Sequence, residues 1–154
     1  MKKLLVGGIV FFVFILGLGK LAYSATLNIE ELVDNFYKAT DLQKEQIVKD
    51  NLGKDISAGA QVDNAGEYDF FDTNSDIKGT YYQVTAVPQK TKDNITYQLI
   101  FLFKDKDTAK DIDKGQKVQK DGRIIRILDE RLQISVWIFC GELTDKDKAL
   151  FNQG

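Results

Sequence analysis

The chain has 154 residues, with 21 Lys and Arg against 23 Asp and Glu, so its formal net charge is −2. Its length corresponds to about one domain and its apolar fraction of 44% is ordinary for a globular protein, which excludes a disordered tail and a multidomain enzyme. The absence of His and the presence of a single Cys exclude His-dependent catalysis, His-ligated zinc, intramolecular disulfides and thiolate-cluster metal sites.

Residues 1–24 have the layout of a secretory signal peptide. Two lysines precede an uninterrupted apolar run over residues 4–19, and the small residues Ala22 and Ser24 stand at −3 and −1 from a cut before Ala25. The run is slightly short for a spanning helix, which needs about 17–25 residues, but an uncleaved inner-membrane anchor is the alternative. The segment holds three basic residues and no acidic one. Cleavage therefore leaves 18 basic and 23 acidic residues, a net charge of −5. We expect a periplasmic or secreted protein.

Residues 25–52 are expected to form an N-terminal helical segment. Asn28 is a candidate N-cap, and Gly53 is a plausible stop signal. Further apolar positions at Leu42 and at residues 47–48 indicate one kinked helix or two short ones. The residues that recur at the spacing of one helical face are Ile29, Leu32, Val33 and Phe36.

After residue 53 the apolar period changes to two, which indicates strands. The first strand is expected over residues 56–62, with Gly59 at a bulge or sharp bend, and residues 68–71 continue it. The remaining elements are four strands over residues 81–87, 95–104, 115–128 and 132–140, a short helical turn over residues 107–113, and a charged tail over residues 144–154 with room for one helical turn.

This order predicts a mainly β protein with an N-terminal α-helix, built as a five-stranded OB-fold barrel over residues 53–143 with a short helical segment between strands 3 and 4. A first strand bent at a glycine fits, because that strand serves both sheets of the barrel. Cys140 is expected to be an inert core residue. The residues expected to face inward are Val84 and Ala86, then Ile95, Tyr97, Leu99, Phe101 and Phe103, and finally Leu132, Ile134, Val136, Ile138 and Cys140.

Four short segments carry a resemblance to a known family. They are Thr40-Asp41-Leu42-Gln43, Gly53-Lys54-Asp55-Ile56, Gly59-Ala60-Gln61-Val62, and Lys114-Gly115-Gln116-Lys117-Val118 followed by Gly122-Arg123-Ile124. Together they resemble the bacterial exported OB-fold proteins of the tRNA-anticodon-binding-like family, over roughly residues 40–143. The resemblance implies an OB barrel and an envelope location. It implies no ligand and no catalytic residue. Asp121 departs from the pattern, where a small or apolar residue is usual, and this leaves the register of the fourth strand open.

Four large apolar residues fall on the outward side of the predicted barrel: Ile100, Leu102, Trp137 and Phe139. We expect the N-terminal helix, through Leu32, Val33 and Phe36, to cover one of these patches. A partner or self-association interface and a small-ligand surface are the alternatives, because exposed apolar patches mark interaction sites.

OB-folds bind through the outer surface of strands 2 and 3. The outward residues there, and so the candidate ligand-binding set, are Tyr81, Gln83, Thr85 and Gln98. A single-stranded nucleic acid or an oligosaccharide is the alternative ligand class. The basic stretch that could serve a nucleic acid comprises Lys110, Lys114, Lys117, Lys120, Arg123 and Arg126, but Asp111, Asp113 and Asp121 interrupt it, so we do not expect nucleic-acid binding.

Asp72, Asn74 and Asp76 have the spacing that begins a calcium loop. Ile77 stands where such a loop needs Gly and Gln83 where it needs Glu, so we expect a polar turn and no metal. No pair of carboxylates stands out as catalytic, and we expect neither enzymatic activity nor a cofactor. The sequence thus predicts an exported binding or interaction protein, with self-assembly as one form of that interaction and membrane contact only through residues 4–19 if they are uncleaved.

Overall fold

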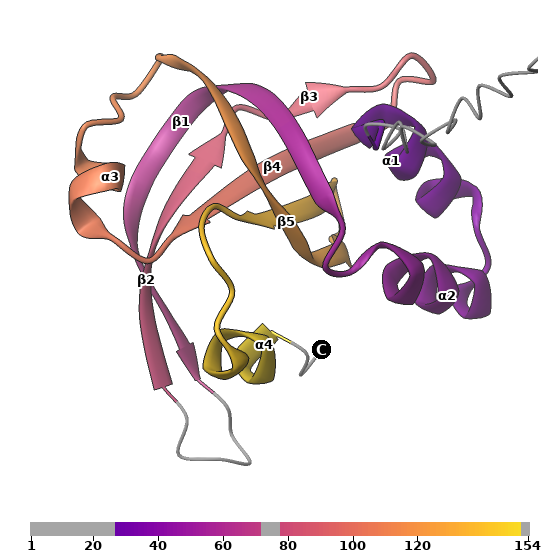
Figure 1. The fold of residues 1–154 in the computed structure, drawn as a ribbon. Coiled ribbons are helices and arrows are strands. Elements are labelled where there is room, and N and C mark those ends of the chain that lie inside the picture. Colours follow the sequence, from indigo (N-terminus) through magenta and orange to yellow (C-terminus); the bar gives the residue numbers. More distant parts are fainter. Residues whose placement is uncertain (1–26, 72–77, 152–154) are drawn as a thin grey trace, which may run out of the picture.

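The computed structural model describes residues 27–71 and 78–151. They form a mainly β protein with a six-stranded sheet and four short helices (Figure 1). The elements are α1 (Ile29–Lys38), α2 (Asp41–Asn51), β1 (Asp55–Phe71), β2 (Lys78–Ala86), β3 (Gln89–Lys90), β4 (Thr96–Phe103), α3 (Lys106–Lys110), β5 (Lys117–Asp129), β6 (Ile134–Phe139) and α4 (Asp145–Phe151).

The strand pairings close a ring. β1 pairs with β2 and β5, β5 pairs with β6, and β6 pairs with β4, which returns to β2. The β4–β6 pair is parallel and the others are antiparallel. The two-residue strand β3, which the alternation pattern did not predict, pairs only with β4. Five of the six strands therefore enclose one apolar interior.

The interior of the ring, which we call the ring core, contains most of the residues predicted to face inward. On β4 these are Tyr97, Leu99, Phe101 and Phe103, and on β6 they are Ile134, Val136 and Ile138. Leu132 is the exception, because it lies in the turn before β6 and is 91% exposed. Strict alternation on β2, β4 and β6 is what made these faces predictable.

Two bulges reverse the facing of β1 and β5. The register shifts between Val62 and Asn64 on β1 and between Ile124 and Arg126 on β5. An extra residue sends later side chains of the same parity to the opposite face. Gly59, where we expected a bulge or a sharp bend, lies in an unbroken register with Gln119, so there is no bulge at this position. The side chain of Gln119 lies across the glycine, 2.4 Å from where a Cβ would stand.

Helices close the two ends of the ring. Asn28 caps α1 as predicted, since its Oδ1 accepts from the backbone N–H of Glu30 at 3.0 Å. The helical segment consists of two short helices, and α2 ends one residue before Leu52, with Gly53 following at a φ of 79°. Leu32, Val33 and Phe36 of α1 and Ala109 of α3 join the ring core from opposite ends (Figure 1).

Candidate functional site

A second apolar cluster lies on the outer face of the ring, separate from the ring core. We call it the outer cluster, and its buried members are Tyr81, Ile100, Leu102, Ile125, Trp137 and Phe139. All four residues considered as an interface belong to it, and Ile100, the most exposed of them, is only 7% exposed. The outward apolar residues are therefore covered within a single chain.

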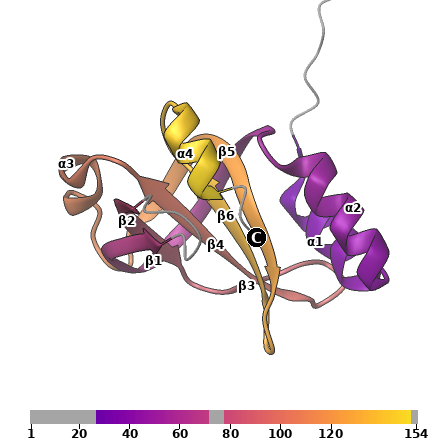
Figure 2. The same cartoon turned by 90° about the horizontal axis from the view of Figure 1, so that it is seen from below.

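The C-terminal segment, residues 141–151, provides part of that cover. Leu143 packs against the outer cluster, and Tyr68 does so from β1. Figure 2 shows α4 lying across the outside of the ring, while α1 and α2 lie to one side. The expectation that the N-terminal helix covers this patch is wrong, because the apolar face of α1 is used in the ring core.

One buried carboxylate fastens α4 to the ring. Asp147 is 1% exposed, and it accepts hydrogen bonds from the hydroxyl of Tyr81 at 2.6 Å and from the ammonium of Lys104 at 2.8 Å. Its Oδ2 also accepts from the backbone N–H and the hydroxyl of Thr144, at 2.8 and 2.6 Å. The backbone N–H of Asp147 donates back to Thr144 Oγ1 at 3.3 Å, which completes a capping box at the start of α4.

These contacts determine the protonation states of Asp147 and Tyr81. Burial alone would raise the pKa of Asp147, but the hydrogen bonds from Lys104, Thr144 and Tyr81 outweigh it and lower the pKa to about 2. Burial, followed by the hydrogen bond to Asp147, raises the pKa of Tyr81 above its ordinary value. Asp147 is thus a permanent anion and Tyr81 a permanent donor at neutral pH, an arrangement suited to holding a segment in place.

The four candidate ligand-binding residues have different surroundings. Tyr81 is 2% exposed and serves Asp147, and its ring meets Phe139 edge-on at 6.1 Å between centroids. Gln98 donates to the carbonyl of Ala86 at 2.8 Å and accepts from Gln133 at 2.8 Å. The remaining two, Gln83 and Thr85, are half-buried on β2. The structure therefore does not gather the four into one open site.

Trp137 is enclosed by an aromatic ring and a cation. The ring of Tyr68 meets it at 5.1 Å with an interplanar angle of 65°, and the guanidinium carbon of Arg126 lies 6.0 Å from its centroid. The bulge on β1 gives Tyr68 this position, because without it the strand would turn that side chain toward the ring core. The sequence showed the aromatic residues but not the bulge.

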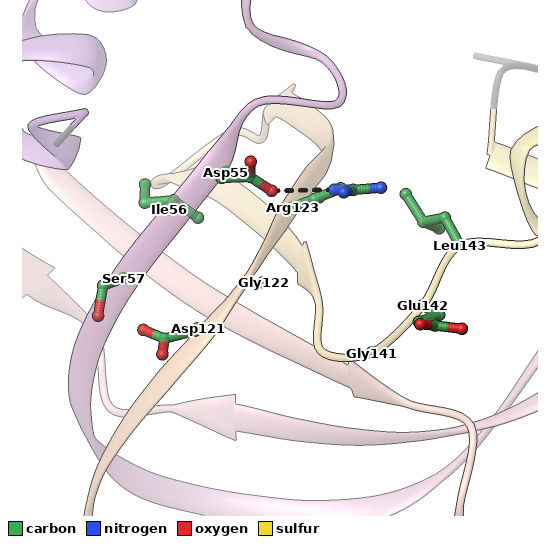
Figure 3. Close-up of a pocket in the computed structure, with 9 residues that line it drawn as sticks. All are labelled: Asp55, Ile56, Ser57, Asp121, Gly122, Arg123, Gly141, Glu142 and Leu143. Carbon is green, nitrogen blue, oxygen red and sulfur yellow. Dashed lines mark hydrogen bonds and ion pairs between the residues drawn. The ribbon is translucent and has the colours of Figure 1, made fainter. Parts of the chain in front are cut away.

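An open groove of about 730 Å³ lies between β1, β5 and the loop that leads to α4 (Figure 3). Arg123 Nε donates to Asp55 Oδ1 at 2.9 Å, and Glu142 and Leu143 stand on the opposite wall. The side chain of Asp55 is 83% exposed and that of Arg123 is 44% exposed, so water screens this pair. The groove offers mixed charge and no buried polar anchor.

The basic stretch does not form a uniform positive surface. Lys110 pairs with Asp107 at 2.6 Å, Lys114 with Asp63 at 3.1 Å, and Arg123 with Asp55. Besides the acidic residues that interrupt the stretch in the sequence, carboxylates outside it thus neutralise part of its positive charge. Such pairing weakens the attraction for a phosphate backbone.

Cys140 is half-buried, and burial raises the pKa of its thiol to about 12. The thiol is therefore protonated at neutral pH and a poor nucleophile.

Asp72, Asn74 and Asp76 lie outside the described residues, as do residues 1–24. Within the described ranges, no three carboxylates and thiols gather as a metal-ligand set. None of the helices in these ranges combines the length and apolar character that a bilayer crossing requires.

Asp147 and Lys104 belong to this candidate site but were not predicted from the sequence. The available signal was Thr144 followed three residues later by Asp147 and then by Ala149, Leu150 and Phe151, which is the pattern of a capping box before an apolar run.

Comparisons of the chain with protein-family models, curated proteins and solved structures found no match.

Proposed function

We propose that the ring is an OB-fold barrel. Its support is the closed path of five strands, with the chain passing from β4 through α3 and β5 before returning to β6 beside β4. This is a Greek-key route, and the helix falls between the third and fourth strands of the ring. Strand β3 is an appendage of β4 in this interpretation.

On this barrel we propose an exported, non-enzymatic binding protein of the bacterial envelope or extracellular space that acts through its outer face. The observation that carries the proposal is that this face already holds a short segment. Leu143 packs against the outer cluster and is partly buried there, and Tyr81 and Lys104 hold Asp147 by direct hydrogen bonds. A face with an apolar floor and a polar anchor at its edge is equipped to bind a peptide segment.

The experiment that tests export is the intact mass and native size of the endogenous protein in separated cell fractions. Cleavage before Ala25 and recovery from the periplasm or medium support the proposal. An uncut chain in the membrane fraction would replace it with the anchored alternative, in which residues 4–19 hold the protein at the inner membrane. A large native species would support an interaction or structural role, and one that contains this chain alone would identify the interaction as self-assembly.

An oligosaccharide or single-stranded nucleic acid remains a second candidate ligand. The half-buried side chains of Tyr68 and Arg126, which lie beside the buried Trp137, favour it, because aromatic and guanidinium planes stack on bases. The chain has a single Trp, so fluorescence titration of Trp137 reports on this place alone. A saturable change with an oligonucleotide at low salt, where electrostatic attraction is strongest, would support the second candidate. No change with oligonucleotides or oligosaccharides would leave the peptide-binding proposal as the only one.

A further inference from the structure

We propose that the C-terminal segment exchanges between two copies of this chain, so that α4 of one copy occupies the outer cluster of the other. This inference rests on the proposed function, since it names the partner of the same outer face as a second copy. Exchange of an identical element between protomers is a low-cost route to a dimer, because each copy reproduces the contacts of the monomer.

The place where α4 sits is chemically selective. The hydroxyl of Tyr81 and the ammonium of Lys104 point to one carboxylate, which belongs to the third residue of a helix capped by Thr144. The capping box of α2 ends in an amide, because Gln43 accepts from the backbone N–H of Thr40 at 2.9 Å. Of the two capping boxes, that of α4 supplies the anion that Tyr81 and Lys104 require.

The connection to α4 is short and begins at a fixed point. The backbone N–H of Cys140 donates to the carbonyl of Leu102 at 2.8 Å, which holds the end of β6 to the ring. Residues 141–144 then lead to α4 and can span up to about 14 Å when extended. Gly141 is exposed and has a φ of 147°, a conformation that L side chains rarely adopt, so the chain can redirect there.

Release of the segment does not require the ring to open. Among the residues whose burial is described, none of those over 141–148 belongs to the ring core, whereas Asp147 lies beside Tyr81 of the outer cluster and Leu143 packs against that cluster. A released chain would keep its folded ring and expose the apolar floor of the outer cluster. Such a floor promotes association until an equivalent segment covers it.

Concentration decides between the closed monomer and the exchanged pair. A short tether gives the segment of the same chain an effective concentration in the millimolar range, which favours the closed monomer in dilute solution. Exchange therefore becomes visible when the chain is crowded or when the contact within the same chain is weakened. This defines a test with two complementary variants of the full-length protein.

The first variant, Tyr81→Phe with Lys104→Ala, removes both donors and keeps the aromatic ring in the outer cluster. The second, Asp147→Ala, removes the carboxylate and keeps both donors. When the two are mixed, we expect a one-to-one complex by native mass spectrometry, because the intact α4 of the first chain fits the intact donors of the second. Each variant alone should be monomeric. Asp145→Ala, which alters an exposed carboxylate of the same helix, is the matched control and should form no complex with the first variant.

A mixture that stays monomeric, while far-ultraviolet circular dichroism shows both variants folded, would overturn the exchange. If either variant does not fold, the wild-type chain is titrated with a fluorescent peptide of residues 141–154 up to several millimolar, so that the peptide competes with the effective concentration of the chain's own segment. Saturable binding that weakens at least about tenfold in the Asp147→Ala peptide supports the exchange, and absence of binding overturns it. The proposed function is tested by cell fractionation and by the Trp137 titration, and neither negative result here changes the outcome of those experiments. Failure of the exchange is therefore distinguishable from failure of the proposed function.

Discussion

Asp147 is a buried anion whose charge is balanced by donors from three parts of the chain: Tyr81 on β2, Lys104 after β4, and Thr144 at the start of its own helix. A buried carboxylate is costly unless its lone pairs are occupied, and here four hydrogen bonds reach it. These hydrogen bonds offset the cost of burying the carboxylate when α4 is docked. Protonation of Asp147 weakens them, and so the charge of this carboxyl is linked to the docking of α4.

Replacing Asp147 by Asn should lower the free energy of unfolding at neutral pH by on the order of 2 kcal/mol, because the pKa of the carboxyl is about 2 in the folded chain and about 3.9 when unfolded. The wild type should have this stabilisation fully above about pH 4 and lose it as the pH falls toward 2. Urea denaturation at several pH values measures both effects. Asp145→Asn is the control, and an equal loss in that variant would refute the assignment.

Gly122 allows β5 and β6 to approach closely. A Cβ at this position would stand 2.4 Å from the carbonyl oxygen of Phe139 and 2.7 Å from Cγ2 of Ile138. We expect Gly122→Ala to lower the free energy of unfolding by about 1–3 kcal/mol through overpacking. Gly66→Ala, where a Cβ meets nothing within 4 Å, should be close to neutral in the same denaturation experiment. Similar effects of the two substitutions would contradict the close approach.

At the scale of elements, α1 is part of the ring core and not a separate appendage. Adjacent aromatic residues of this helix have opposite exposures, since Phe36 is 3% exposed and Tyr37 is 57% exposed. Phe36→Ala should lower the free energy of unfolding by about 3–5 kcal/mol, whereas Tyr37→Ala should change it by about 0.5 kcal/mol or less. Thermal denaturation of both variants checks the difference. A small effect at Phe36 would place α1 outside the folded unit.

The elements that could be predicted from the sequence are those whose side chains follow one period without interruption. The alternation on β4 and β6 predicted their inward residues, and Asn28 predicted the start of α1. The bulge on β5 could not be predicted, because a one-residue shift leaves no mark in the apolar pattern when both faces are apolar. Ile124 and Ile125 illustrate this: they are neighbours in sequence but belong to the ring core and the outer cluster. The bulge on β1 is followed by exposed residues over 64–67, which carry no apolar pattern in which a shift could show.

The sequence predicted the four outward apolar residues of the candidate site, but it did not predict Asp147, Lys104 or the segment that covers those four residues. Alternation placed Ile100, Leu102, Trp137 and Phe139 on the outer face, and the outer cluster contains all four. What covers them depends on contacts between distant segments, such as Tyr81 with Asp147 across 66 positions. Spacing along the chain carries no information about such a pair. Only the local capping-box pattern at Thr144 could have indicated that a helix begins there.

For the molecule as a whole, two apolar clusters on opposite sides of one sheet predict two steps of acid unfolding. Trp137 reports on the outer cluster, and far-ultraviolet circular dichroism reports mainly on the ring. As the pH falls below about 4, protonation of Asp147 should release the C-terminal segment and shift the Trp137 emission before the circular dichroism changes. Coincident transitions by the two methods would show that the segment and the ring unfold together.

Asp147 is docked as a buried anion on the outer face of the ring. The carboxyl pKa of Asp147, measured by carbon-detected nuclear magnetic resonance titration of the full-length protein, tests this placement. The structure predicts a pKa of about 2, because hydrogen bonds from Lys104, Thr144 and Tyr81 outweigh the cost of burial. A pKa near 3.9, the value of an aspartate in water, would mean that α4 is not seated on the ring in solution.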